Sequence, residues 1–163
     1  MEDAPMEPPL IMTDEPMQAP MPAWAYPILN PTLKFILRTP LHRMVSGGAM
    51  ILLFAGRKSG KRYEVVVVYQ NLDGMLYTFS ATSWSRNFIG GAPVALRLRG
   101  ELVRATARVV EDPALIERVI RHMVSAHGEP LVAGMGLIGR GPDGATRLQM
   151  PKGSRLVEFT LAR

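Results

Sequence analysis

Several residue types and patterns are scarce in this sequence, and each absence excludes a class of site. The 163 residues contain no cysteine, which excludes disulfide bonds, thiolate metal sites and a cysteine nucleophile. Only three histidines are present, and His122 and His127 are five positions apart rather than the four that would place both on one helical face, so no metal site is expected. No apolar run approaches about 18 residues, so no transmembrane helix is expected.

Lysine and arginine are missing from residues 1–23, which contain five acidic residues among many prolines and methionines. We predict a disordered acidic leader over residues 1–23 and one domain over residues 24–163. Because the N-terminus is acidic and broken by prolines, it has no secretory signal pattern, and a cytoplasmic location is expected. After residue 23 the chain has nineteen basic and nine acidic side chains, a formal charge of +10, which indicates an anionic partner.

The remainder of the chain has the residue pattern of a mainly β protein. Apolar runs and alternating stretches bounded by turn residues predict strands over residues 49–55, 63–69, 75–80, 94–99, 102–110 and 156–161. A helix is expected over residues 113–127, with Asp112 as its N-cap and Gly128 after its end. About six antiparallel strands with few helices predict a barrel or a sandwich.

A further helix is expected over residues 30–46, beginning at Asn30 and Pro31 and interrupted by Pro40. It is amphipathic, with apolar residues on one face and basic residues on the other. Such a helix either packs on the domain's own core or makes peripheral contact with a membrane. The sequence leaves both alternatives open.

The stretch FAGRKSGKRYEVVVVY places a basic, glycine-containing turn between two predicted strands. This tip contains Gly56, Arg57, Lys58, Ser59, Gly60, Lys61 and Arg62. It is not a nucleotide P-loop, because it is one residue short, has Arg62 where a hydroxyl belongs, and leads into a strand rather than a helix. It is either a solvated hairpin turn or a nest of main-chain N–H groups and cationic side chains that holds an anion.

A second loop, SATSWSRN, follows the third predicted strand and supplies hydroxyl groups beside a tryptophan. Two donor-rich loops at the ends of adjacent strands would suit the phosphate of a bound cofactor, with Trp84 as a flat apolar wall. Arginines at positions 97, 99, 104 and 108 could extend the basic patch toward nucleic acid. However, alternation along the strands already accounts for them as a solvent-facing surface, and aromatic residues for base stacking are few.

Three motifs in order, NPTLKFILRTPLHR, GRKSGKRYEVVVVY and W-x-x-N-x-x-G-G-A-P-V-x-L-R-L-R-G, resemble the deazaflavin-dependent nitroreductase family. These proteins, also described as quinone reductases, belong to the flavin/deazaflavin oxidoreductases, which are related to pyridoxamine-phosphate oxidases. The resemblance runs from Asn30 to Val110. It implies a split β-barrel of the FMN-binding-protein type, a homodimer, and the deazaflavin coenzyme F420 as the first choice of cofactor, with FMN or FAD as the alternative.

The resemblance also implies the sites and the reaction. The tip residues would hold the cofactor's phosphate and acidic tail, and Ser80, Ala81, Thr82, Ser83, Trp84 and Asn87 would contact cofactor and substrate. That family has Ser-Lys-Gly-Gly where this chain has Ser80 to Ser83, so one lysine is absent here. The reduced cofactor would pass a hydride to a quinone, nitro compound or activated alkene, with Ser80 as a candidate proton relay. The alternative is a non-catalytic split-barrel module that binds a phosphorylated ligand or nucleic acid.

Overall fold

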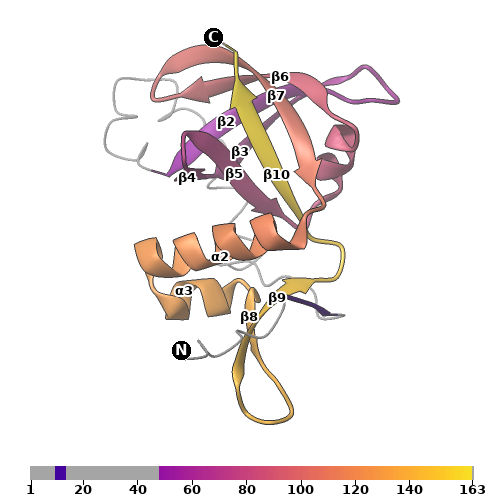
Figure 1. Ribbon diagram of the computed structural model, residues 1–163. Coiled ribbons are helices and arrows are strands. Elements are labelled where there is room, and N and C mark those ends of the chain that lie inside the picture. Colours follow the sequence, from indigo (N-terminus) through magenta and orange to yellow (C-terminus); the bar gives the residue numbers. More distant parts are fainter. Residues whose placement is uncertain (1–9, 14–47, 163) are drawn as a thin grey trace, which may run out of the picture.

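The computed structural model describes residues 10–13 and 48–162, and these form a curled antiparallel sheet above a layer of helices (Figure 1). The main sheet contains β2 (Ala49–Ala55), β3 (Arg62–Val68), β4 (Gln70–Leu72), β5 (Met75–Ser80), β6 (Ala92–Leu98), β7 (Glu101–Val110) and β10 (Arg155–Leu161). The predicted fold class, a mainly β split barrel, is confirmed. The sheet has seven strands rather than about six, because the three residues of β4 pair with β5 as a separate strand.

The sheet curls so that its two edge strands are neighbours in sequence. The strand order is β3-β2-β6-β7-β10-β5-β4, and only Tyr69 separates β3 from β4. The hydroxyl of Thr78 on β5 donates a hydrogen bond to the carbonyl of Val68 at the end of β3, and this bond joins the two sides of the barrel. Every pairing in this sheet is antiparallel.

The barrel encloses a core that the alternating pattern predicted. On β7 the side chains of Ala105 and Ala107 are buried, whereas the intervening Arg104, Thr106 and Arg108 are exposed. Large apolar side chains fill the interior, including Met50, Leu52, Phe54, Leu76, Phe88, Leu96, Val157 and Phe159. This period of two separates an apolar interior from a polar outer surface, as expected for a half-buried sheet.

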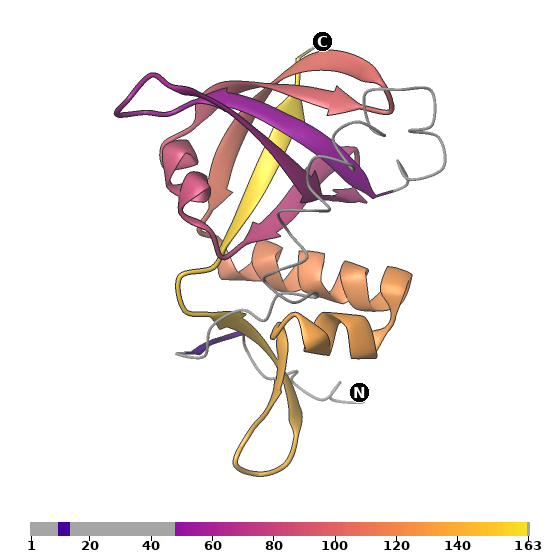
Figure 2. The same cartoon turned by 180° about the vertical axis from the view of Figure 1, so that it is seen from behind.

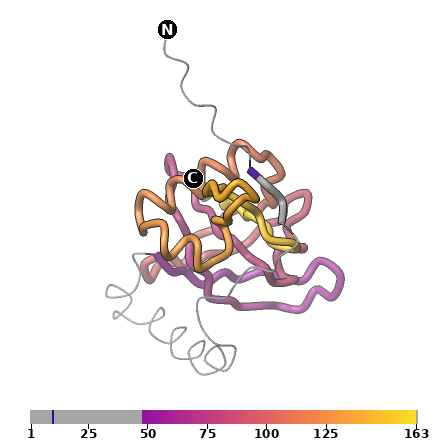
Figure 3. The backbone as a smooth tube through the Cα atoms, turned by 90° about the horizontal axis from the view of Figure 1, so that it is seen from below, coloured from indigo at the N-terminus to yellow at the C-terminus, as the bar shows by residue number. Residues whose placement is uncertain are grey.

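The outer side of the sheet near β5 and β10 is covered by α2 (Pro113–His127) and α3 (Glu129–Gly134). Seen from below, these segments overlie the strands (Figure 3). The α2 prediction is confirmed: the Asp112 carboxylate accepts the N–H of Ala114 at 3.0 Å, and Gly128 ends the helix with φ at 87°. Ile116, Val119, Ile120 and Met123 are its buried face. The second predicted helix, over residues 30–46, lies outside the described residues.

A small second sheet lies beside these helices and was not predicted. It has the order β1-β9-β8 and consists of β1 (Ile11–Thr13), β8 (Ile138–Arg140) and β9 (Thr146–Pro151). β1 pairs with β9 in parallel and belongs to the segment predicted as a leader, of which the structure describes residues 10–13. In the described part of the chain, no helix has both the length and the apolar character needed to cross a membrane.

One polar row crosses the outer face of the sheet beneath the helices. Glu158 on β10 lies opposite Tyr77 on β5 and Arg108 on β7, and it accepts hydrogen bonds from the Arg108 guanidinium at 2.8 and 3.0 Å. Tyr77 is only 5% exposed. Burial, and secondly the negative charge of Glu158, raise the pKa of the Tyr77 hydroxyl above its ordinary value.

Candidate functional site

The basic tip is an ordered turn that connects β2 to β3, and we call residues 56–61 the tip turn. Phe54 pairs with Tyr63 and Ala55 with Arg62, so the strands end immediately before Gly56 and after Lys61. The Gly56 N–H donates to the Lys61 carbonyl at 2.8 Å, and the Gly60 N–H donates to the Gly56 carbonyl at 2.8 Å. The hairpin projects beyond the sheet, beside the short helix η2 (Figure 2).

Two glycines make this turn possible for different reasons. Gly60 has φ at 66°, in the left-handed region that favours glycine. Gly56 has no room for a side chain, because a Cβ there would lie 2.8 Å from Ser59 Oγ and 2.9 Å from Tyr63 Cε2. The glycines therefore fix the shape of the tip turn and leave its cationic side chains exposed at the surface.

The second loop folds into the 3-10 helix η2 (Ser83–Phe88). Its start is held by hydroxyl groups: Ser80 Oγ lies 2.8 Å from Thr82 Oγ1 and accepts the Thr82 N–H at 3.1 Å. The buried Ser85 donates its hydroxyl to the Thr82 carbonyl at 3.0 Å. These hydroxyls therefore satisfy the polar groups of the loop itself, as is common where serine and threonine begin a turn.

Asn87 joins the two loops. Its Oδ1 accepts the backbone N–H of Arg57 at 2.8 Å, and its Nδ2 donates to the Trp84 carbonyl at 2.8 Å. One side chain thus fixes the position of the tip turn relative to η2, across 30 residues of sequence.

An aromatic cluster packs behind the two loops. Phe54 stacks on Tyr63 with ring centroids 5.3 Å apart, and it meets the edge of Phe88 at 5.2 Å. Trp84 lies 6.3 Å from Phe54 and 5.8 Å from Phe88, centroid to centroid. Such offset and edge-on contacts are favourable for aromatic rings. The cluster gives the site a rigid apolar side.

Between the loops lies a cavity of about 420 Å³, which we call the basic pocket. Its lining consists of Phe54, Gly56, Arg57, Lys58, Ser59, Tyr63, Ser83, Trp84, Arg86 and Asn87. Three of these side chains are cationic, none is acidic, and among residues 48–162 none of the three cations has an ion-pair partner. The volume is typical of small-molecule sites, about 300–1,000 Å³. Its combined charge and aromatic character suit a phosphorylated ring compound.

The structure brings seven of the predicted site residues to this pocket: Gly56, Arg57, Lys58, Ser59, Ser83, Trp84 and Asn87. Six others do not line it: Gly60, Lys61, Arg62, Ser80, Ala81 and Thr82. Ser80 is 5% exposed and bonded within its own turn. The assignment of these residues to a cofactor remains a prediction. In the described part of the chain, no group of three or more histidine and acidic side chains could hold a metal ion.

Sequence reasoning missed Phe54, Tyr63 and Arg86. The first two become neighbours only through the register of β2 and β3, which follows from the six residues of the tip turn. Strand alternation alone assigns Phe54 to the barrel core. The structure places Phe54 in that core and also in the lining of the pocket. Arg86 lies in the SWSRN stretch of the second loop. Whether its side chain reaches the pocket depends on the 3-10 form of the helix, which the sequence did not indicate.

The fold and the basic pocket together define a split-barrel protein with a positively charged cleft beside an aromatic wall. Comparison with protein-family models and with curated proteins gave no match. Similar solved structures include the haem storage protein HutZ from Vibrio cholerae, with 14% identity over 82% of this chain and 89% of that chain and a TM-score of 0.49. A candidate pyridoxamine 5′-phosphate oxidase from Listeria innocua has 10% identity over 82% and 93% of the two chains, with a TM-score of 0.48.

A FAD-binding protein from Mesorhizobium loti is also similar, with 14% identity over 88% of this chain and 91% of that chain and a TM-score of 0.41. Similarities of this size support no conclusion about the ligands or activity of this chain. The split-barrel part of the expected family resemblance is thus confirmed by the strand topology. Membership of the deazaflavin-dependent branch remains a prediction.

Proposed function

We propose that this protein is an oxidoreductase that binds a phosphorylated flavin-type coenzyme in the basic pocket. It would transfer a hydride from the reduced coenzyme to a small organic acceptor such as a quinone, a nitro compound or an activated alkene. The observation that carries the proposal is the juxtaposition of Arg57, Lys58 and Arg86 with the Trp84 side of a single cavity that no acidic residue lines. A ligand with an anionic group and an aromatic ring complements both sides.

The chain's own residues would bind and orient the coenzyme rather than carry out bond chemistry. Arg57 and Lys58 would neutralise the phosphate, and the Ser59 hydroxyl would donate to it. The Arg57 backbone N–H is already engaged by Asn87, so main-chain donors to the phosphate would come from other residues of the tip turn. When bound, the coenzyme supplies the hydride, and the protein contributes position and exclusion of water.

The deazaflavin coenzyme F420 is the first choice of cofactor, and FMN or FAD is the alternative. The choice rests on the order and spacing of the sequence motifs, since the pocket's cations would accept any of the three phosphates. The Ser80 hydroxyl is hydrogen-bonded to the Thr82 hydroxyl. Ser80 could therefore act as a proton relay only if this hydrogen bond broke. The Tyr63 and Ser83 side chains line the pocket directly and are the alternatives for this role.

The test is a binding titration of the full chain with F420, FMN and FAD, followed by fluorescence of the coenzyme. The double variant Arg57→Ala/Lys58→Ala should weaken the binding of the preferred coenzyme about ten- to hundredfold, because two charged hydrogen-bond donors are lost. Arg104→Ala/Arg140→Ala is the matched control: it also removes two exposed cations, but neither lines the pocket. The control should bind as the wild type does.

Turnover is measured separately, with the reduced coenzyme and a quinone or nitroaromatic acceptor. Saturable binding without turnover of any acceptor would favour the non-catalytic alternative. Indifference to all three coenzymes, together with salt-sensitive binding to oligonucleotides, would refute the redox proposal and favour a nucleic-acid module. We also propose a homodimer, which light scattering of the purified chain would test.

A further inference from the structure

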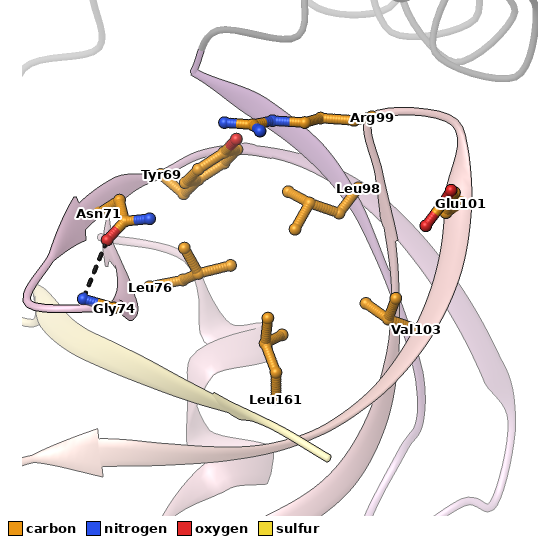
Figure 4. Close-up of a pocket in the computed structure, with 9 residues that line it drawn as sticks. All are labelled: Tyr69, Asn71, Gly74, Leu76, Leu98, Arg99, Glu101, Val103 and Leu161. Atoms are coloured by element: carbon orange, nitrogen blue, oxygen red, sulfur yellow. Dashed lines mark hydrogen bonds between the residues drawn. The ribbon is translucent and has the colours of Figure 1, made fainter. Parts of the chain in front are cut away.

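A second cavity, of about 310 Å³, lies at the opposite end of the barrel, and we call it the mouth pocket. Its lining consists of Tyr69, Asn71, Gly74, Leu76, Leu98, Arg99, Glu101, Val103 and Leu161, and it shares no residue with the basic pocket. β5 runs from one pocket to the other, since Leu76 stands near its start and Ser83 follows its end. The side chains lie around a common hollow (Figure 4).

The mouth pocket has an apolar floor and a polar rim. Leu76 is 2% exposed, and Leu98, Val103 and Leu161 are partly buried around it. The rim is formed by exposed polar side chains from β4, the β6–β7 turn and the start of β7: Asn71, Arg99 and Glu101. A pocket of this kind buries the apolar part of a small ligand and orients it by a few polar contacts.

The backbone at Arg99 is unusual for this residue type. Its φ of 51° lies in the left-handed region, followed by Gly100 at 87°, in the tight turn between β6 and β7. Turns of this form prefer asparagine, aspartate or glycine at the first position, and Asp73 occupies that place in the turn between β4 and β5. Residues in a disfavoured backbone conformation are often found where the side chain has a function. The Arg99 guanidinium lies across the opening, next to the Tyr69 hydroxyl (Figure 4).

The rim holds one positive and one negative charge that are not paired with each other. Arg99 and Glu101 are separated only by Gly100, yet no ion pair joins them, and neither has an ion-pair partner elsewhere among the described residues. A ligand that complements the whole pocket therefore carries a carboxylate, an ammonium group and an apolar side chain.

We propose that the mouth pocket is a second ligand site, independent of the proposed coenzyme site, and that it binds a free apolar amino acid. The carboxylate of the ligand faces Arg99, its ammonium group faces Glu101, and its side chain packs on Leu76, Leu98 and Leu161. A peptide terminus supplies only one of the two charges, so the site distinguishes a free amino acid from the end of a chain.

The experiment titrates L-leucine into the full chain, labelled at leucine and valine methyl groups for NMR, up to millimolar concentration. Saturable shifts are expected for the methyl groups of Leu98, Val103 and Leu161. N-acetyl-L-leucine lacks the ammonium group and L-leucine amide lacks the carboxylate, so each should bind about tenfold more weakly. The titration contains no coenzyme, so its result does not depend on whether the proposed coenzyme site is correct.

Two rim variants and one control complete the test. Arg99→Asn keeps a residue that suits the turn, so its melting temperature should be equal to or above that of the wild type, while affinity for L-leucine falls about tenfold or more. Glu101→Gln should lower affinity similarly, and Arg104→Gln, a charge loss outside the pocket, should leave it unchanged. Absence of methyl shifts, or equal affinity in the rim variants and the wild type, would overturn the proposal. Equal binding of all three leucine compounds would overturn it too.

Discussion

Removal of the Asn87 side chain should separate the two loops of the basic pocket. Asn87 makes two hydrogen bonds of 2.8 Å, one accepted from the Arg57 N–H and one donated to the Trp84 carbonyl. A hydrogen bond contributes about 1 kcal/mol to stability on average, so Asn87→Ala should lower the free energy of unfolding by about 2 kcal/mol. For a chain of this size that corresponds to a fall in melting temperature of roughly 4–8 °C.

The assay is thermal unfolding followed by tryptophan fluorescence and by circular dichroism, with and without the preferred coenzyme. Asn71→Ala is the matched control, because Asn71 accepts one hydrogen bond, from the Gly74 N–H at 3.2 Å, at the other end of the barrel. It should cost about half as much stability and leave coenzyme affinity unchanged. In Asn87→Ala, affinity should fall together with stability, because the tip turn is no longer held against η2.

The variant Asn87→Asp distinguishes the effect of the tip turn's position from the effect of the charge in the pocket. An aspartate still accepts the Arg57 N–H but cannot donate to the Trp84 carbonyl, so it should lose about 1 kcal/mol. It also brings a carboxylate into a pocket whose lining is cationic, and should therefore weaken phosphate binding more than Asn87→Ala does. If Asn87→Ala melts within about 1 °C of the wild type and retains full affinity, the bridging role assigned to Asn87 is wrong.

Three further outcomes follow from packing and burial. Gly56→Ala should destabilise by about 1–3 kcal/mol in chemical denaturation, because its Cβ would lie 2.8 Å from the nearest side-chain atom, whereas Gly48→Ala meets nothing within 4 Å and should change little. Leu96→Ala, at a fully buried site, should cost about 2–5 kcal/mol, and Leu102→Ala, at a site 58% exposed, less than about 0.5 kcal/mol. Because burial raises the pKa of Tyr77, its neutral form stabilises the fold fully below pH about 10, and this contribution is lost as pH rises through the raised folded-state pKa. Alkaline titration of phenolate absorbance should show a late-titrating group that Tyr77→Phe removes; a wild-type curve identical to that of the variant would contradict it.

Most of the barrel could be predicted from residue types because local rules and tertiary packing agree there. The alternation of β7, the apolar run of β2 and the Asp73–Gly74 turn each determine their element without help from distant residues. The helix α2 is bounded by an aspartate cap and a glycine, which are equally local signals. These are the elements for which sequence and structure agree.

The remaining elements depend on contacts that the sequence does not display. β8 and β9 lie in or beside a glycine-rich stretch, and β8 has only three residues, so neither composition nor period indicated a hairpin. β1 exists only by pairing with β9, more than 130 residues away along the chain. In the site, the two loops were predicted, but their connection through Asn87 and the approach of Tyr63 to Phe54 follow from strand register. Ser80 could be assigned to a strand end, yet whether its hydroxyl faced the pocket depended on the turn that follows.

The position of β10 has a consequence for how the chain folds. The pairs β2–β3, β4–β5 and β6–β7 are joined by short turns, so each can form with little loss of loop entropy. β10 instead inserts between β5 and β7, where Leu156 lies opposite both Phe79 and Val110. Until residues 155–161 have been synthesised, β5 and β7 each present an unpaired strand edge, and the nascent barrel is open to pairing with other chains. Pulse-labelled hydrogen exchange should therefore show the amides that bond β10 protected last, and simultaneous protection of all strands would contradict this order.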